Sequence, residues 1–336
     1  MNAASAKGIS GAKLLIAFAL VATVCVPIFL GGTETFGALL HFPSAGYIAI
    51  VALVVLNWLA RTLKLQIILR RLLVHAPFTR VLGVSLAADF GFMVTPAGIG
   101  GYAASVYFLR RIGASTSSAA AITAADQLLD AIFFVLAVPV AGVSLSWSIM
   151  PRMTSIGLSM ALIVCLALSI VWMVWRTYRL ALDGSRRCPQ RLRQAAFALR
   201  DFARRSRTDA QLLLAGGSFF AACICTLTAL QQIGRYGVLW TIFAVLGYHL
   251  SFALVFVLQT LVVQAASWTG IPSGGGAAEI GLSASFSEWI SGSSMAAALL
   301  IWRMATLYLG LIAGAAAIAW LSSAAPQATS TDSLLD

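Results

Sequence analysis

The chain has 336 residues, of which 60% are hydrophobic and only 10% are charged, with a mean hydropathy of +0.92 and a formal net charge of +11. This composition excludes an ordinary soluble domain and indicates an all-α polytopic membrane protein. The five cysteines form neither a disulfide framework nor a zinc-binding pattern. Because no catalytic triad, nucleotide-binding loop or metal-ligand spacing occurs either, the sequence predicts no catalytic residues, no metal site and no cofactor.

The positive charge is concentrated in one segment. Residues 176–209 contain ten arginines and three aspartates. Such a block is typical of a cytoplasmic segment that faces anionic lipids, so we expect no nucleic-acid partner. Within it, residues 189–207 are compatible either with an amphipathic helix on the inner leaflet or with a solvated linker.

A first membrane half is expected over residues 13–175, after a cytoplasmic tail formed by residues 1–12. A spanning helix needs about 20 apolar residues. Full spans are predicted at residues 14–30, 47–71, 118–143 and 156–175. Two shorter apolar arms, 81–94 and 102–109, are predicted to form a re-entrant hairpin that opens toward the cytoplasm, since arginines bracket them on one side. The loop 31–44 contains no lysine or arginine and should be outside, as should the loop around 147–152.

The second membrane half is expected over residues 210–321, after the linker 176–209. Residues 212–233 are predicted to cross outward and to end at Arg235. Residues 236–269 are too long for one span, so we divide them at Gly247 into an interfacial piece and the first arm of a second hairpin. After the returning arm, which ends near residue 289, the last span is predicted at 296–321 and a disordered tail at 322–336. The result is an inverted-repeat-like plan with six full spans and two re-entrant helical hairpins.

Both predicted hairpins are broken by proline and glycine. The first break is TPAGIGG at 95–101, and the second is IPSGGGAAE at 271–279. An unpaired backbone N–H or C=O in hydrocarbon costs several kcal/mol, so each break must pack inside protein or line a wet cavity. Two such breaks at corresponding places in two halves are typical of a transporter with a binding site near the membrane midplane.

The breaks also supply candidate ligands for an anion. A glycine-rich break that opens a helix presents unpaired N–H groups and a positive dipole end, which suits a phosphate or carboxylate headgroup. The alternative is that the glycines only allow close helix packing. The candidate substrate-binding residues of the breaks are Pro96, Gly98, Gly100, Gly101, Pro272, Gly274, Gly275 and Gly276. Glu279 begins the helix after the second break, where it is either a cap or a gate or proton site.

Ionisable residues within apolar stretches complete the set of candidates. These are Arg61, Lys64, Asp89, Asp126, Asp130 and Arg303. A charge at membrane depth costs at least about 2.5–3 kcal/mol unless it is paired or wet. For Lys64 the alternative is that its side chain reaches the inner interface. The aspartates are predicted either to be counter-ions of Arg61 and Arg303 or to carry protons.

At these residues the chain resembles the lysylphosphatidylglycerol synthase/flippase transmembrane family, over roughly residues 13–321. The similarity rests on Arg61, on the first break, on the segment DQLLD at 126–130, on PSGGGAAE at 272–279 and on Arg303. The most specific piece is the second break, which is similar to the family's Pro-Gly-Gly-x-Gly-x-x-Glu pattern. The resemblance implies movement of lipids between leaflets, without the soluble aminoacyl-transfer domain of the bifunctional members.

We therefore interpret the chain as a lipid flippase or translocase with membrane lipids as partners, either anionic phospholipids or a lipid-linked carrier. Two other classes stay open: a membrane enzyme that modifies a lipid carrier, and a scaffold for a lipid-synthesis complex. The expected location is a bacterial cytoplasmic (inner) membrane, and homodimerisation is left open.

Overall fold

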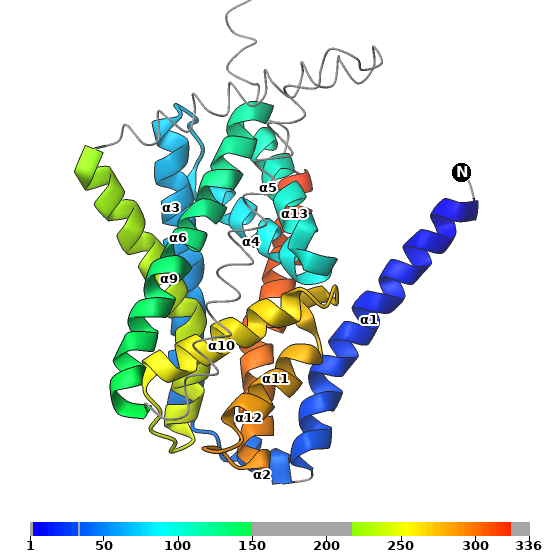
Figure 1. Ribbon diagram of the computed structural model, residues 1–336. Coiled ribbons are helices and arrows are strands. Elements are labelled where there is room, and N and C mark those ends of the chain that lie inside the picture. Colours follow the sequence, from blue (N-terminus) through cyan, green and yellow to red (C-terminus); the bar gives the residue numbers. More distant parts are fainter. Residues whose placement is uncertain (1–2, 33, 150–216, 324–336) are drawn as a thin grey trace, which may run out of the picture.

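The computed structural model describes the backbone of residues 3–32, 34–149 and 217–323, with side chains from residue 16 onward except those of 146–149 (Figure 1). Every regular element in these ranges is a helix, and no strand occurs in them. The predicted all-α class is therefore confirmed. The predicted span 156–175, the linker 176–209 and nearly all of the tail 322–336 lie outside the described residues.

The first part of the chain forms long helices on either side of a short broken pair. Its elements are α1 (Ala3–Gly31), α2 (Glu34–Leu40), α3 (Ser44–Arg71), α4 (Phe78–Val94), the 3₁₀ turn η1 (Pro96–Gly98), α5 (Ile99–Arg111) and α6 (Thr116–Ile149). Ser115 caps α6, since its Oγ accepts a hydrogen bond from the Ser118 N–H at 3.1 Å. Helices α4 and α5 pack against each other across the turn, as the hairpin prediction requires.

The second described part repeats this order. Its elements are α9 (Gly217–Val245), α10 (Phe252–Ser267), the 3₁₀ turn η3 (Pro272–Gly274), α11 (Ala277–Phe286), α12 (Gly292–Arg303), the π-helical turn η4 (Met304–Tyr308) and α13 (Leu309–Ser323). Helices α10 and α11 pack against each other across η3. Helices α12 and α13 form one long helix that is interrupted only by η4.

Four helices of the described ranges are long and apolar enough to cross a membrane. They are Ser44–Arg71, Thr116–Leu145, Gly217–Val245 and Gly292–Ser323. A fifth span results if Ile16–Gly31 and Glu34–Leu40, which meet at 107°, are counted together. The chain is thus a multi-pass membrane protein by the length and composition of its helices.

Three predicted boundaries were wrong. Residues 34–40 form helix α2 where a loop was expected, and α6 continues to Ile149 where the loop 147–152 was expected to begin. Helix α9 does not end at Arg235 but runs without interruption to Val245, so residues 236–245 are no separate interfacial piece. The predicted division at Gly247 does hold, because this residue has φ 89° and separates α9 from α10.

Close helix contacts hold the described helices together, as α3 against α9 and α4 against α13 illustrate. Gly234 of α9 lies against the α3 backbone, where an added Cβ would come within 2.7 Å of the Leu53 oxygen. Gly314 of α13 lies equally close to α4, because an added Cβ would meet the Leu86 oxygen at 2.7 Å. Glycine is needed at both positions to bring the two backbones together.

We predict that Gly234→Ala lowers the melting temperature of the purified protein. The methyl group would push α9 away from the α3 backbone, and overpacking of this kind costs about 1–3 kcal/mol. Gly142→Ala in α6 is the control, because no atom lies within 4 Å of its added Cβ. The control should be neutral or stabilising by up to about 1 kcal/mol. Equal melting temperatures of the two variants would contradict the α3–α9 packing.

Candidate functional site

The two helix breaks adopt the same backbone conformation. In η1, Ala97 and Gly98 have φ values of 53° and 70°, and in η3, Ser273 and Gly274 have φ values of 54° and 61°. A proline precedes each pair, so both breaks are Pro-x-Gly turns. In each turn two successive residues have positive φ and therefore lie outside the right-handed helical region. Left-handed φ at the non-glycine positions costs of order 1–3 kcal/mol each and persists only where the surroundings hold it.

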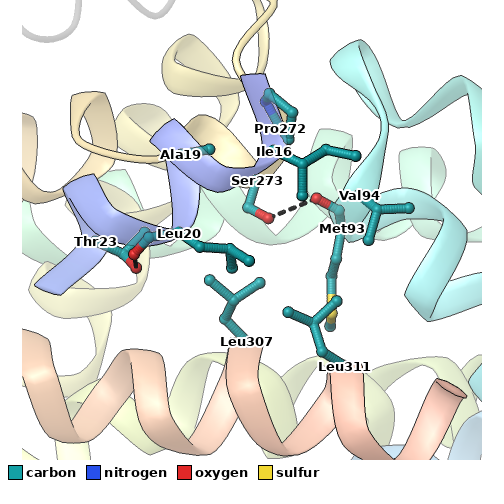
Figure 2. Close-up of a pocket in the computed structure, with 10 residues that line it drawn as sticks. All are labelled: Ile16, Ala19, Leu20, Thr23, Met93, Val94, Pro272, Ser273, Leu307 and Leu311. Carbon is teal, nitrogen blue, oxygen red and sulfur yellow. Dashed lines mark hydrogen bonds between the residues drawn. The ribbon is translucent and has the colours of Figure 1, made fainter. Parts of the chain in front are cut away.

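The two breaks lie against each other. The Ser273 hydroxyl of η3 donates a hydrogen bond of 2.7 Å to the Met93 carbonyl at the end of α4. Figure 2 shows this bond among the residues that line a small pocket, which is lined mainly by apolar side chains of α1, α4 and the helix that follows Arg303. Thr23 and Ser273 are the polar residues of this lining. The structure therefore joins two segments that are about 180 residues apart in the chain.

Several backbone N–H groups at the breaks have hydrogen-bond acceptors within the protein. In the first break the Gly98 N–H donates to the Thr95 carbonyl at 3.1 Å, and the Gly100 N–H donates to Thr95 Oγ1 at 2.8 Å. In the second break the Gly275 N–H donates to the Pro272 carbonyl at 3.1 Å. The expectation that the Gly275 N–H is open to a headgroup was therefore wrong.

Glycines of the breaks make close contacts with neighbouring helices. An added Cβ on Gly275 would meet the Ala19 oxygen of α1 at 2.6 Å, and one on Gly101 would meet the Phe92 ring at 2.2 Å. Gly276 has φ 82°, which favours glycine, whereas Gly275 has φ −55°. Close packing is thus one role of these glycines, and anion binding by them stays a prediction.

A five-residue ionic cluster connects α3, α4 and α6. Arg61 of α3 pairs with Asp89 of α4 and, at 3.3 Å, with Asp126 of α6. Lys64 lies one turn further along α3, with its Nζ 2.7 Å from Asp126 and 3.0 Å from Asp130. Aspartates 126 and 130 share one face of α6, as their spacing of four predicts. The sequence-predicted counter-ions of Arg61 therefore include Asp89 and Asp126.

Lys64 does not reach the membrane interface, so that interpretation was wrong. Its side chain has no exposed surface, and two carboxylates neutralise it. The same cluster extends to α9, where the Gln231 Nε2 donates to Asp130 at 3.3 Å. The outer carboxylates keep some contact with solvent, since the side chains of Asp89 and Asp130 are 17% and 18% exposed.

A second buried ion pair holds the second break. Glu279 has no exposed surface; one of its oxygens accepts the Gly276 N–H at 2.8 Å, and the other pairs with the Arg303 Nε. The Arg303 Nη1 also donates to the Ser273 carbonyl at 3.3 Å, whereas its buried Nη2 has no hydrogen-bond partner in the part of the chain that the structure describes. Arg303 therefore pairs with Glu279 and not with the aspartates. The π-helical turn that follows Arg303 is a feature often found at functional sites.

The candidate residues thus form two clusters on either side of the contact between the breaks. Phe92, which precedes Met93, connects the first cluster to this contact, because the Arg61 Cζ lies 5.8 Å from the centre of its ring. Ser273 connects the second cluster through Arg303. Among the described residues, no ion pair joins Arg61 and Arg303 to a common carboxylate.

Some site residues were not predicted. Thr95 caps the first break, Phe92 lies beneath it, and Gln231 extends the ionic cluster. The signal for Gln231 was present, because adjacent glutamines in an apolar helix are costly unless they are hydrogen-bonded. Thr95 and Phe92 carry no such signal, since both residue types are common in membrane helices.

We predict that Lys64→Ala strongly destabilises the protein in detergent. It leaves Asp126 with one cation and Asp130 with none, and removal of one partner of a buried pair costs about 3–5 kcal/mol. Arg70→Ala is the control, because Arg70 is exposed in the last turn of the same helix. Adding Asp130→Asn to Lys64→Ala should recover part of the loss. Similar melting temperatures for Lys64→Ala and Arg70→Ala would contradict the cluster.

Comparison with known proteins identifies the family of this chain. The chain is 22% identical over 274 residues to a UPF0104 membrane protein of Archaeoglobus fulgidus. The aligned region covers 78% of this chain and 82% of that protein. Residues 12–314 match the family described as the lysylphosphatidylglycerol synthase TM region. This match includes both breaks and both ionic clusters, so the chain belongs to the lysylphosphatidylglycerol synthase transmembrane-region family.

Proposed function

We propose that this protein is a lipid translocase that moves an anionic or lipid-linked headgroup between leaflets, without covalent chemistry. The observation that carries the proposal is the contact between the two breaks, with a buried ionic cluster on each side. Charged side chains inside membrane segments are costly and mark pathways for ions or polar substrates. Paired broken helices at the interface of two repeats are the common construction of a transport site.

The proposed membrane arrangement has six spans and two re-entrant hairpins. Spans are assigned to α1, α3, α6, α9 and the long helix α12–α13, with the sixth at residues 156–175 outside the described ranges. Helices α4, α5, α10 and α11 contain 10–17 residues each, fewer than the about 20 that a span needs. Two hairpins that meet at their breaks, each entering from its own side, account for these lengths in a bacterial cytoplasmic membrane.

The size of the pocket beside the breaks indicates whether a headgroup could pass in this conformation. Its cavity volume of about 10 Å³ has room for about one water molecule, far below the about 300–1,000 Å³ of ordinary ligand sites. We therefore assign this conformation to a closed state, in which the Ser273–Met93 hydrogen bond holds the breaks together (Figure 2). Translocation then requires the breaks to separate, and such a change would release the Arg303 contact with the Ser273 carbonyl.

The charge of the site favours an anionic headgroup. The buried Nη2 of Arg303 lacks a hydrogen-bond partner among the described residues, and Arg61 lies beside Phe92 at the first break. A phosphate that enters between the separated breaks would accept charge-assisted hydrogen bonds, which are about twice as strong as neutral ones. A zwitterionic headgroup would bring its own cation into the same space and would gain less.

The direct test is a leaflet-accessibility assay in proteoliposomes. Fluorescent phosphatidylglycerol and phosphatidylcholine are each placed in symmetric vesicles, and a membrane-impermeant quencher reports the fraction that reaches the outer leaflet. We expect the protein to accelerate the crossing of phosphatidylglycerol over protein-free vesicles, and of phosphatidylcholine much less. Folded, reconstituted protein that accelerates neither lipid would contradict the proposal.

We predict that Gly275→Leu slows this translocation by about tenfold or more. The new side chain would collide with the α1 backbone at Ala19 and displace the second break, at a cost of about 1–3 kcal/mol for overpacking. Gly142→Leu is the matched control because space around it is open. Gly314 is unsuitable as a control, since it packs against α4. Equal rates for the two variants, with equal amounts of folded protein, would place the translocation path elsewhere.

A further inference from the structure

Arg235 lies on the inward side of α9. The opposite side is marked by exposed Phe219, Ile233 and Trp240, whose spacings are multiples of seven residues, so that they form one stripe along the helix. Arg235 follows Ile233 by two residues, which places it about 200° away from that stripe around the helix. The arginine is therefore directed away from the apolar face that suits lipid.

The side chain of Arg235 is nevertheless exposed. Its neighbours one turn before it, Gln231 and Gln232, are 3% and 1% exposed, and its neighbours one turn after it, Val238 and Leu239, are fully buried. An exposed arginine among buried neighbours on an inward face reaches an accessible region on the protein side of the helix. Lipid contact does not explain this exposure.

Arg235 also lies at the depth of the helix centre. The adjacent Gly234 packs against Leu53 and Asn57, which are in the middle of α3. An unpaired charge at this depth costs at least about 2.5–3.5 kcal/mol. Within residues 16–145 and 217–323, Arg235 forms neither a hydrogen bond nor an ion pair. A polar partner that these described ranges do not supply would remove this cost.

The neighbouring ionic cluster contains more carboxylates than cations. Its three aspartates face only two cations, Arg61 and Lys64. Arg235 lies within electrostatic range of Asp89, whose side chain keeps 17% of its surface exposed. Asp89 thus attracts Arg235 toward the accessible edge of the cluster without fixing it in an ion pair, so the guanidinium stays available to another anion.

We infer that Arg235 is the accessible ligand for the phosphate of an anionic lipid headgroup. The arginine would bind this phosphate at the edge of the Arg61–Asp89 pair, before the headgroup enters between the breaks. This inference rests on the proposed translocase function. Arginine suits the role because its planar guanidinium binds phosphate oxygens in a bidentate manner and stays charged at any depth.

The test measures lipid binding to the full-length protein in neutral detergent by calorimetric titration. The probes are dihexanoyl phosphatidylglycerol, dihexanoyl phosphatidylcholine and inorganic phosphate, which separate an anionic lipid, a zwitterionic lipid and a soluble anion. The variants are Arg235→Gln and Arg235→Lys. Arg70→Gln serves as the control, because it removes an exposed arginine from the end of a helix.

We expect wild type to bind the phosphatidylglycerol probe, and Arg235→Gln to weaken this binding about ten- to a hundredfold, as for loss of a hydrogen bond to a charged group. Arg235→Lys should recover part of the affinity, and the Gln variant should bind with a weaker dependence on salt. The control should bind as wild type does. Because Arg235 has no hydrogen-bond or ion-pair partner among the described residues, its removal should not lower the melting temperature.

Three other results would overturn the inference. Unchanged affinity of folded Arg235→Gln would show that the arginine has no headgroup role while leaving the translocase proposal in place. Equal affinity for inorganic phosphate and for the phosphatidylglycerol probe would identify a soluble anion as the ligand. Wild type that binds none of the probes would remove the anionic headgroup from the proposed function as well.

Discussion

The constraint on which the described structure depends is that a helix broken inside a membrane must find partners for its backbone within the protein. Each break closes on itself through a Pro-x-Gly turn and is then held by one side chain, Thr95 in the first and Glu279 in the second. The Ser273–Met93 hydrogen bond joins the two. The close packing of α1 on Gly275 and of α5 on Phe92 follows from the same need, because both contacts exclude lipid from the exposed backbone at the turns.

The ionic groups obey a related constraint, since a cation in hydrocarbon is stable only beside an anion or water. Glu279 meets this requirement for Arg303 and caps α11 with its second oxygen, so one carboxylate serves both the charge and the backbone. The pairs formed by Arg61 and Lys64 distribute charge over three helices. Replacement of such pairs by apolar residues is often neutral or stabilising. Stability alone therefore does not require them, which is consistent with the polar pathway proposed above.

The sequence predicted the helical class, the two breaks and the partners of Arg61, because proline, glycine and charge in apolar surroundings are strong local signals. For Lys64 it left open a position at the interface, because its distance from the end of α3 resembles that of an ordinary terminal lysine; the structure buries this side chain instead. It ended α9 at Arg235 because an arginine usually marks a helix end. The continuation to Val245 depends on the packing of Gly234 on α3, a contact that no local pattern contains. The same limit applies to Gly314, whose partner Leu86 lies far away in the chain.

Both halves contain a Pro-x-Gly turn, but different kinds of residue hold the two turns in place. Fully buried Glu279 and nearly buried Arg303 fix the second break, and the Ser273 carbonyl binds that arginine too. The first break is capped by a neutral hydroxyl, and the cluster beside it keeps two partly exposed carboxylates, Asp89 and Asp130. A charged cap in a dry environment resists separation more than a neutral cap does. In the proposed translocation cycle we therefore expect the first break to move at lower cost, and the second break to be the fixed surface against which it would open.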